Sequence, residues 1–251
     1  MSMIVTTVVP DGIVMAADSS LVSFKFVDII NFAKGNIPEA MQNTFSGTCA
    51  YAKENIVGSK FLTRSARKLH VMKGNSIAIA DGNQRNIGKE SINPHIEHFC
   101  NNSHYDDPES CARGLLNFVK NLDQNIKAVY HVCGYSPGGK IPLPEFWYVD
   151  VKENIVMNGV GEMRYGISFC GANEYFSQYI VPISKNMASY SLQDAVDVTM
   201  FAIETSIKLA RFIDREELIS PPIDLLAIEP SGVKWIQQKT LKAEGYYGVN
   251  C

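Results

Sequence analysis

The first third of the chain contains short apolar runs that are separated by turn residues. Four of these runs pair into two predicted β-hairpins, 4–9 with 13–17 and 68–72 with 76–80. Asp11-Gly12 separates the first two runs and Gly74-Asn75 the second two, and such dipeptides are strong hairpin signals. Residues 22–62 have mixed periodicity, so we expect irregular structure with some helix there.

Three later segments repeat apolar residues every three or four positions, which is typical of amphipathic helices. They cover 85–99, a segment that begins at Asp107-Pro108, and 191–213. Proline is well tolerated in the first turn of a helix, which suits Pro108. In the last helix Ser191 is a candidate N-cap, and Asp194 places negative charge in the first turn.

The remaining apolar runs predict further strands. They cover 128–135, 145–151, 155–160, 223–228 and 233–237. Strands and helices therefore come in separate blocks, which favours an α+β fold with helices packed on antiparallel sheets. Two sheets packed face to face with helices outside would give four layers, and the pattern alone leaves three layers open.

Composition and charge exclude several classes of function. The 251 residues fit one large domain or two small ones, and 46% are hydrophobic. A net charge of −3 without a basic run argues against nucleic acid and anionic membrane as partners. The start of the chain lacks the charged region of a secretory signal, and no window approaches the ~20 apolar residues of a membrane span, so we expect a cytoplasmic protein. The six cysteines show no C-x-x-C spacing and are expected to be free thiols.

Ser2 is the residue with the most unusual chemical potential. If Met1 is removed, Ser2 carries a free α-amine beside its own hydroxyl, and the pKa of an α-amine is ~7.7–8.0. Such an amine can take the hydroxyl proton, so that one residue is both nucleophile and base. Taken alone, Ser2 is also simply a common second residue, because small residues are favoured there.

The stretch GIVMAADSS, which contains Gly12 and Asp18, resembles the GxxxAADSR signature of proteasome-type β subunits, a group of N-terminal nucleophile hydrolases. In that family a nucleophilic threonine precedes the glycine and the aspartate by fixed spacings. Both spacings lead to Ser2 in this chain. The resemblance implies that Ser2 is the nucleophile and that Asp18 orients a catalytic lysine.

The stretch SARKLHVMKGNSIAIADGN resembles the family segment that supplies this lysine and an oxyanion hole. Lys68 lies in R-K-L, and Gly82 follows at the family spacing. The resemblance implies that Lys68 lowers the cost of the serine alkoxide and that the Gly82 N–H binds the oxyanion. Lys68 taken alone would be read as a solvated surface lysine.

The second half of the chain also resembles the family, in FWYVDVKENIV, SFCGANEYFSQYI, NMASYSLQDAVDV and ISPPIDLLAIEPSGVKW. The last of these is more similar still to bacterial proteasome-like proteins. The resemblance covers nearly all of 1–251 as one domain and leaves an unmatched insertion at about 22–62. It implies a four-layer αββα sandwich of two antiparallel sheets flanked by helices. The insertion is either a lid or wall of the substrate pocket, or a loop at a subunit contact.

Several supporting positions depart from the family pattern. The arginine of AADSR is Ser19 here, and the supporting serine of an SGSG loop falls at Ala172 or Asn173. By spacing, the acidic residue and the serine that support the nucleophile become Glu217 and Ser220, and Asp214 lies nearby as an alternative carboxylate.

Together these features predict a hydrolase of peptide or other amide bonds that needs no cofactor and no metal. We expect a homo-oligomer, possibly a ring, by family resemblance, while an ATPase partner is left open. The rival interpretation is a catalytically silent ring or scaffold subunit, which the missing support residues favour. His95, His98 and Cys100 raise a metal site as a weaker alternative, because no further ligand completes a known spacing.

Overall fold

The computed structural model describes most of the chain outside the predicted insertion and the C-terminal tail. The described residues are 3–25, 59–63, 66–82, 86–87, 90–137, 141–171, 183, 186–212 and 219–239.

One antiparallel sheet is built around the first predicted hairpin. Its strand order is β12 (Gly166–Gly171), β1 (Met3–Val9), β2 (Gly12–Ala17), β13 (Asp224–Glu229) and β14 (Gly232–Gln237). Every residue of β1 and β2 is buried. These two strands have protein on both faces, which explains why their sequences are nearly continuous apolar runs.

The second antiparallel sheet contains the second predicted hairpin. Its strand order is β11 (Ile155–Asn158), β10 (Leu143–Asp150), β9 (Val129–Ser136), β6 (Ile77–Asp81) and β5 (Leu69–Val71). Side chains from both sheets meet in one buried cluster that includes Ile4, Met15, Ala80 and Phe146. The two sheets therefore form a sandwich.

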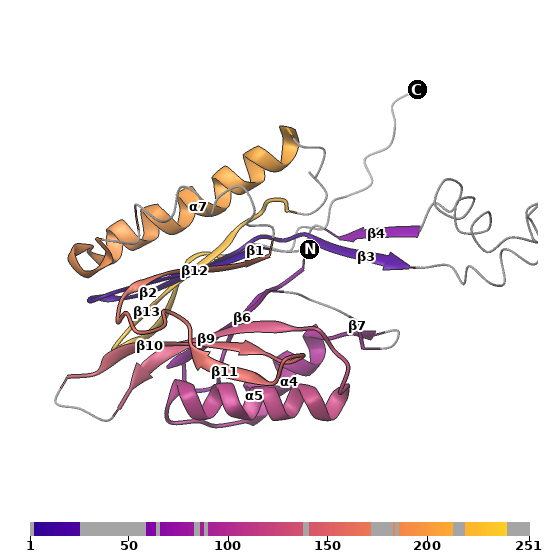
Figure 1. The fold of residues 1–251 in the computed structure, drawn as a ribbon, viewed down its shortest axis with the longest axis horizontal. Coiled ribbons are helices and arrows are strands. Elements are labelled where there is room, and N and C mark those ends of the chain that lie inside the picture. Colours follow the sequence, from indigo (N-terminus) through magenta and orange to yellow (C-terminus); the bar gives the residue numbers. More distant parts are fainter. Residues whose placement is uncertain are drawn as a thin grey trace, which may run out of the picture.

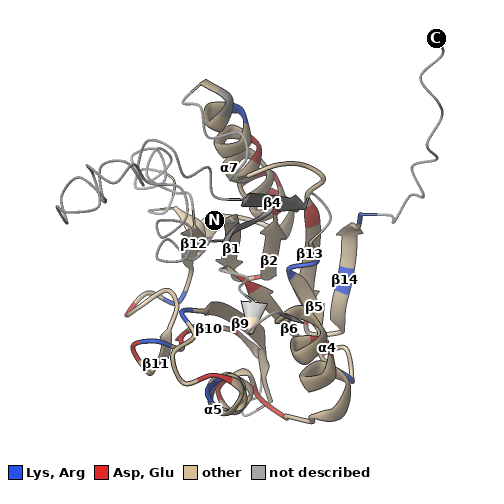
Figure 2. Cartoon of the chain, turned by 90° about the vertical axis from the view of Figure 1, so that its right-hand side faces the viewer, with Lys and Arg blue, Asp and Glu red and all other residues tan. Residues whose placement is uncertain are grey.

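Helices cover the outer faces of the sandwich. Helix α7 (Leu192–Phe212) packs on β1 and β2, whereas α4 (Asn93–Asn102) and α5 (Pro108–Leu122) pack on the second sheet (Figure 1). Charged residues of both signs lie along α5 and α7 (Figure 2). This arrangement confirms the predicted four-layer αββα sandwich. No helix in the described part of the chain is both long enough and apolar enough to span a membrane.

Only the two ends of the predicted insertion are described. They are β3 (Leu21–Lys25) and β4 (Ser59–Thr63), which pair antiparallel with each other. Figure 1 shows this pair beyond the end of the first sheet. The segment 26–58 lies outside the described residues, so the role of the insertion stays a prediction.

Two elements differ from the sequence prediction. The helix expected at 85–99 begins only at Asn93, and the short strands β7 (Asn86–Ile87) and β8 (Glu90–Ser91) precede it. Pro94 explains the later start, because proline lacks an amide hydrogen and is therefore tolerated in the first turn of a helix but not in its interior. Strand β12 was missed, since its sequence resembled a family loop. A one-turn 3₁₀ helix (Met187–Ser189) leads toward α7.

The start of α7 confirms the predicted cap. The Ser191 hydroxyl accepts from the Asp194 amide at 3.2 Å, and the Asp194 carboxylate accepts from the Ser191 amide at 2.8 Å. This reciprocal pair satisfies two helix-end donors.

Replacing Ser191 with alanine is expected to lower the free energy of unfolding by about 1 kcal/mol, because one capping acceptor is lost. Urea denaturation of Ser191→Ala beside Ser189→Ala checks this. Ser189 lies just outside the helix and bonds to the Asn186 carbonyl, so it controls for loss of an exposed hydroxyl. Equal stability of the two variants would contradict the capping role.

Candidate active site

Asp18 lies just after β2 and is fully buried. Its Oδ1 accepts from the Met3 amide at 2.8 Å and from Lys68 Nζ at 2.5 Å. Its Oδ2 accepts from the Ser20 amide at 2.8 Å and from the Ser220 amide at 3.2 Å. Four donors from four parts of the chain thus converge on one carboxylate, which fixes its position and offsets the cost of burying its charge.

Lys68, directly before β5, points into the sandwich rather than into solvent. Its side chain has no exposed surface, and its ammonium forms an ion pair with Asp18. Burial lowers the pKa of Lys68, and the adjacent Asp18 carboxylate opposes that shift. The prediction that Lys68 and Asp18 lie together is therefore consistent with the geometry, and the surface-lysine alternative is excluded.

Ser220, one of the two predicted supporting residues, also lies in this site. Its backbone amide donates a hydrogen bond to Asp18, and its hydroxyl accepts one from Ser20 Oγ at 2.6 Å. Its carbonyl accepts from the Ser19 amide at 3.0 Å. Ser220 therefore ties the segment before β13 to the end of β2.

A second buried ion pair lies beside the first and was not foreseen. Lys239 Nζ is 2.7 Å from Asp224 Oδ2, and both side chains are almost fully buried. The same ammonium donates to Ser19 Oγ at 2.9 Å and to the Ala66 carbonyl. Its positive charge contributes to lowering the pKa of Lys68. We call Asp18, Ser19, Ser20, Lys68, Ser220, Asp224 and Lys239 the polar cluster.

Lys239 contacts Ser19, a position at which this chain departs from the family pattern. The family pattern has an arginine at that position, and the serine of this chain lacks its positive charge. In the structure a cation from the end of the last hairpin contacts the Ser19 hydroxyl instead. The positive charge is thus present near this position although it comes from a distant part of the sequence.

Gly82 follows β6 and packs closely on the first sheet. A Cβ at this position would lie 3.0 Å from Ile4 Cδ1 and 3.2 Å from Cys170 Sγ. The Gly82 amide donates to the Val129 carbonyl at 2.9 Å, which continues the ladder between β6 and β9. An oxyanion bound to this amide would have to take the place of Val129, so the geometry does not support the expected role of Gly82.

The other candidate residues lie outside the described residues. These are Ser2 with Met1 before it, the carboxylates Glu217 and Asp214, and the loop residues Ala172 and Asn173. Their roles stay predictions.

The metal alternative is not supported by the geometry. Cys100 is buried in the core, whereas His98 is exposed and contacts Asn102. Burial also raises the pKa of the Cys100 thiol to about 12, which disfavours the thiolate that binds metal. Across the described part of the chain, no group of three or more His, Cys, Asp or Glu side chains could hold a metal ion.

Comparison with known proteins bears on the fold alone. No protein-family profile matches the chain, and no curated protein sequence matches it either. A solved structure of a Gly-1 mutant of Anbu from Hyphomicrobium sp. strain MC1 has a TM-score of 0.59 at 13% identity, over 97% of this chain and 88% of that one. Anbu from Yersinia bercovieri, described as an ancestral beta-subunit, has a TM-score of 0.58 at 11% identity, over 94% and 87% of the two chains. The chain therefore has the Anbu fold.

Asp224 and Lys239 are the functional candidates that sequence reasoning missed. Asp224 opens an apolar strand, and an acidic residue in that position signals a paired, buried carboxylate. Lys239 carries no comparable signal, because it follows exposed residues of an edge strand.

Proposed function

We propose that the chain is an amide-bond hydrolase whose nucleophile is Ser2 after removal of Met1. The observation that carries this proposal is the position of the Met3 amide. It donates to Asp18, and Asp18 pairs with the buried Lys68.

The peptide bond that joins residue 2 to Met3 adds support to this proposal. The Met3 nitrogen is joined to the preceding residue by a peptide bond of about 1.33 Å. Whatever residue precedes Met3 thus begins one bond away from an atom that contacts Asp18. Residue 2 is therefore bonded directly to an atom that contacts the Asp18 carboxylate, and this carboxylate in turn contacts the Lys68 ammonium.

The proposed chemistry has two stages. Ser2 Oγ attacks the amide carbonyl carbon while its proton passes to the Ser2 α-amine, and the Lys68 ammonium lowers the energy of the developing charge. The C–N bond breaks, and the leaving amine takes the proton back from the α-ammonium. Water then attacks the serine ester, the α-amine again accepts a proton, and the acid product leaves as Ser2 Oγ is reprotonated.

The substrate proposed is a peptide or a small amide. A likeness to a protein described as a beta-subunit fits assembly of several copies, so we include a homo-oligomer, with a ring as one form, in the proposal. The predicted insertion at about 22–62 begins shortly after Asp18 in the sequence, so we include a wall of the substrate pocket as its proposed role.

A silent ring or scaffold subunit is the second candidate. The observation that favours it is the Gly82 amide, which bonds to Val129. A hydrolase with this fold would need another hydrogen-bond donor to the oxyanion. Otherwise the Gly82 amide would have to release the Val129 carbonyl and bind the oxyanion instead.

Intact mass measured before and after treatment with a β-lactone electrophile tests the hydrolase. We expect loss of one methionine and one adduct that maps to Ser2, because an N-terminal serine with its own base is the most nucleophilic hydroxyl of the chain. Ser2→Ala is expected to lose Met1 equally and to gain no adduct.

The control for specific labelling is Ser231→Ala, which removes an exposed hydroxyl in the turn before β14 and should label like the parent chain. A retained Met1 with no adduct would support the silent subunit. An adduct of equal yield on Ser2→Ala would contradict Ser2 as the nucleophile.

A further inference from the structure

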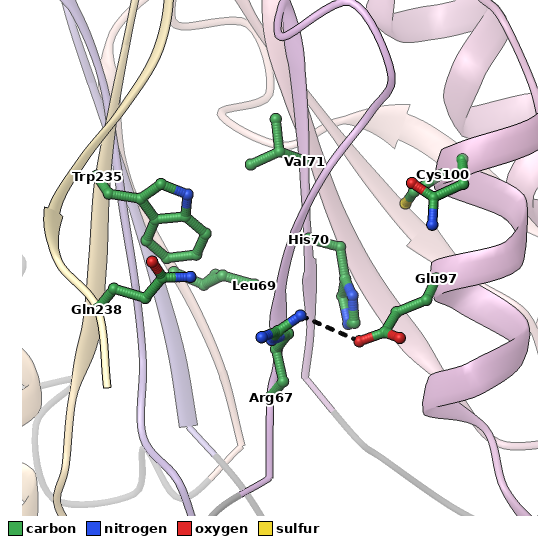
Figure 3. A pocket seen from close by; sticks show the side chains of 9 residues that line it. Arg67, Leu69, His70, Val71, Glu97, Cys100, Trp235 and Gln238 are labelled. Carbon is green, nitrogen blue, oxygen red and sulfur yellow. Dashed lines mark hydrogen bonds and ion pairs between the residues drawn. The ribbon is translucent and has the colours of Figure 1, made fainter. Parts of the chain in front are cut away.

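Lys239 lies where the last hairpin passes close to the candidate active site. Figure 3 shows the end of β14 across a cavity of about 260 Å³ from the start of β5. Gln238 lines one side of this cavity, and Arg67 and Leu69 line the other. Gln238 precedes Lys239 in the sequence, and the other two residues flank Lys68. The two lysines therefore belong to segments that approach each other in space.

The Lys239 ammonium has as many acceptors among the described residues as it has N–H donors. It is 2.7 Å from Asp224 Oδ2, and it donates to Ser19 Oγ at 2.9 Å and to the Ala66 carbonyl. The side chains of Lys239 and Asp224 are only 7% and 2% exposed. Rotation of the ammonium would leave a buried donor without an acceptor, which is costly, so these contacts hold it in one position.

Two of these acceptors lie in the segments that carry the ion pair of Asp18 and Lys68. Ser19 follows Asp18 directly, and Ala66 precedes Lys68 by two residues. The Ala66 amide also donates to the Ser19 carbonyl at 3.1 Å, so the two segments contact each other through their backbones. The Lys239 side chain adds a second connection between them.

Asp224 holds Lys239 in place through both of its carboxylate oxygens. Oδ1 accepts from the Lys239 backbone amide at 2.8 Å, and Oδ2 accepts from the ammonium. Asp224 begins β13, and in the pairing of β13 with β2 it lies opposite Ala17, the residue before Asp18. The first sheet therefore fixes Lys239 relative to the strand that leads to Asp18.

We propose that Lys239 is a positioning residue of the candidate active site, which keeps Asp18 and Lys68 in contact by joining the segments that carry them. Lys239 acts through these two residues. Its effect on Ser2 rests on the proposed function, whereas its effect on Lys68 does not.

The charges around Lys68 make this role measurable. Burial is the main cause that lowers the pKa of Lys68, Asp18 and Asp81 raise this pKa, and Lys239 lowers it as a like charge. Lys239→Met leaves the Asp224 carboxylate uncompensated, so the pKa of Lys68 should rise. Asp224→Asn leaves the Lys239 ammonium uncompensated, so the pKa of Lys68 should fall. Simple loosening of the structure would admit water and raise this pKa in both variants.

NMR of lysine side chains labelled at Cε measures the titration of Lys68 in the full chain. We expect the midpoint pH to rise in Lys239→Met, to fall in Asp224→Asn, and to lie between these values in the double variant. The double variant buries neither charge alone, so it keeps the test open if Lys239→Met fails to fold. A midpoint in Asp224→Asn that is not below that of the double variant would overturn the proposal.

Hydrogen exchange of the Ser20 and Ser220 amides measures the positioning itself, because both amides donate to Asp18. In the double variant of Lys239 and Asp224 these two amides should exchange about tenfold faster than in the parent chain, while the amides of β9 in the other sheet stay unchanged. Equal acceleration in β9 would mean global destabilisation and would contradict a local role.

Labelling of Ser2 by the β-lactone connects this role to the proposed function. The rate constant for labelling should fall about tenfold in Lys239→Met, because a small displacement of groups beside the nucleophile slows its reaction. Lys234→Met is the matched control, since Lys234 forms an exposed ion pair on the same hairpin, and it should label like the parent chain. Equal labelling of Lys239→Met and the parent would overturn the proposal. A parent chain that gains no adduct would contradict the hydrolase instead, and the titration and exchange measurements would then decide the role of Lys239.

Discussion

Lowering the pH from about 7 to about 5 is expected to reduce the free energy of unfolding by about 4 kcal/mol. The cause is a pair of buried histidines, His70 and His131. Burial lowers the pKa of each to about 3. Both must therefore stay neutral in the folded protein over this range, whereas the same side chains take up protons in the unfolded chain.

The direction follows from proton counting. Between about pH 3 and 6.5 the unfolded chain binds more protons than the folded one at these two sites, so stability rises with pH and is lost as pH falls. His131 stays away from solvent in the folded protein, because it is fully buried between the sheets. Its Nδ1 bonds to Thr6 Oγ1 at 2.9 Å, and its ring packs on Phe146.

Urea unfolding at several pH values between about 5 and 7 measures this slope. His131→Leu should remove about half of the pH dependence, whatever it does to stability at neutral pH, because one of the two protons is gone. His104→Gln is the control, since its side chain is largely exposed and stays in water in both states. A slope that is unchanged in His131→Leu would contradict the assignment to buried histidines.

The fold was predictable because its signals are local and repeated. The first hairpin, the helix that begins at Pro108 and the last hairpin each combine a periodic pattern with a turn or cap. Gly12 illustrates the limit of motif reading. A Cβ there would lie 2.8 Å from the Ile228 carbonyl, so close packing on β13 already accounts for this glycine of the motif.

Asp18, Lys68 and Ser220 lie together in the structure, whereas their catalytic roles stay predictions. Their spacing along the chain carried that information only through the family resemblance. Lys239 was not predictable in the same way, because its partners Asp224 and Ser19 are distant in sequence. The hydrogen bond from Gly82 to Val129 was likewise a property of strand pairing, which no spacing encodes.

Replacing Lys68 with methionine is expected to lower the free energy of unfolding by about 3–5 kcal/mol, because the Asp18 carboxylate is left buried without a cation. The remaining three donors to Asp18 are backbone amides, which stabilise the negative charge but do not neutralise it. The same variant should lose labelling at Ser2 if the proposed hydrolase is correct.

The matched control is Lys234→Met on β14. Lys234 also forms an ion pair with a carboxylate, Glu229, but its side chain is 62% exposed. Loss of that exposed pair should cost less than about 1 kcal/mol. Comparing the two lysines therefore isolates burial as the cause, because the chemical change is the same in both variants.

A double variant distinguishes the ion pair from simple packing. Asp18→Asn combined with Lys68→Met removes both charges, so its loss of free energy of unfolding should be smaller than the sum of the losses in the two single variants. If packing of the lysine side chain were the main contribution, the second change would add to the loss instead. Chemical denaturation of the two single variants and the double variant thus decides whether Asp18 and Lys68 act as one unit, which the proposed function of Ser2 requires.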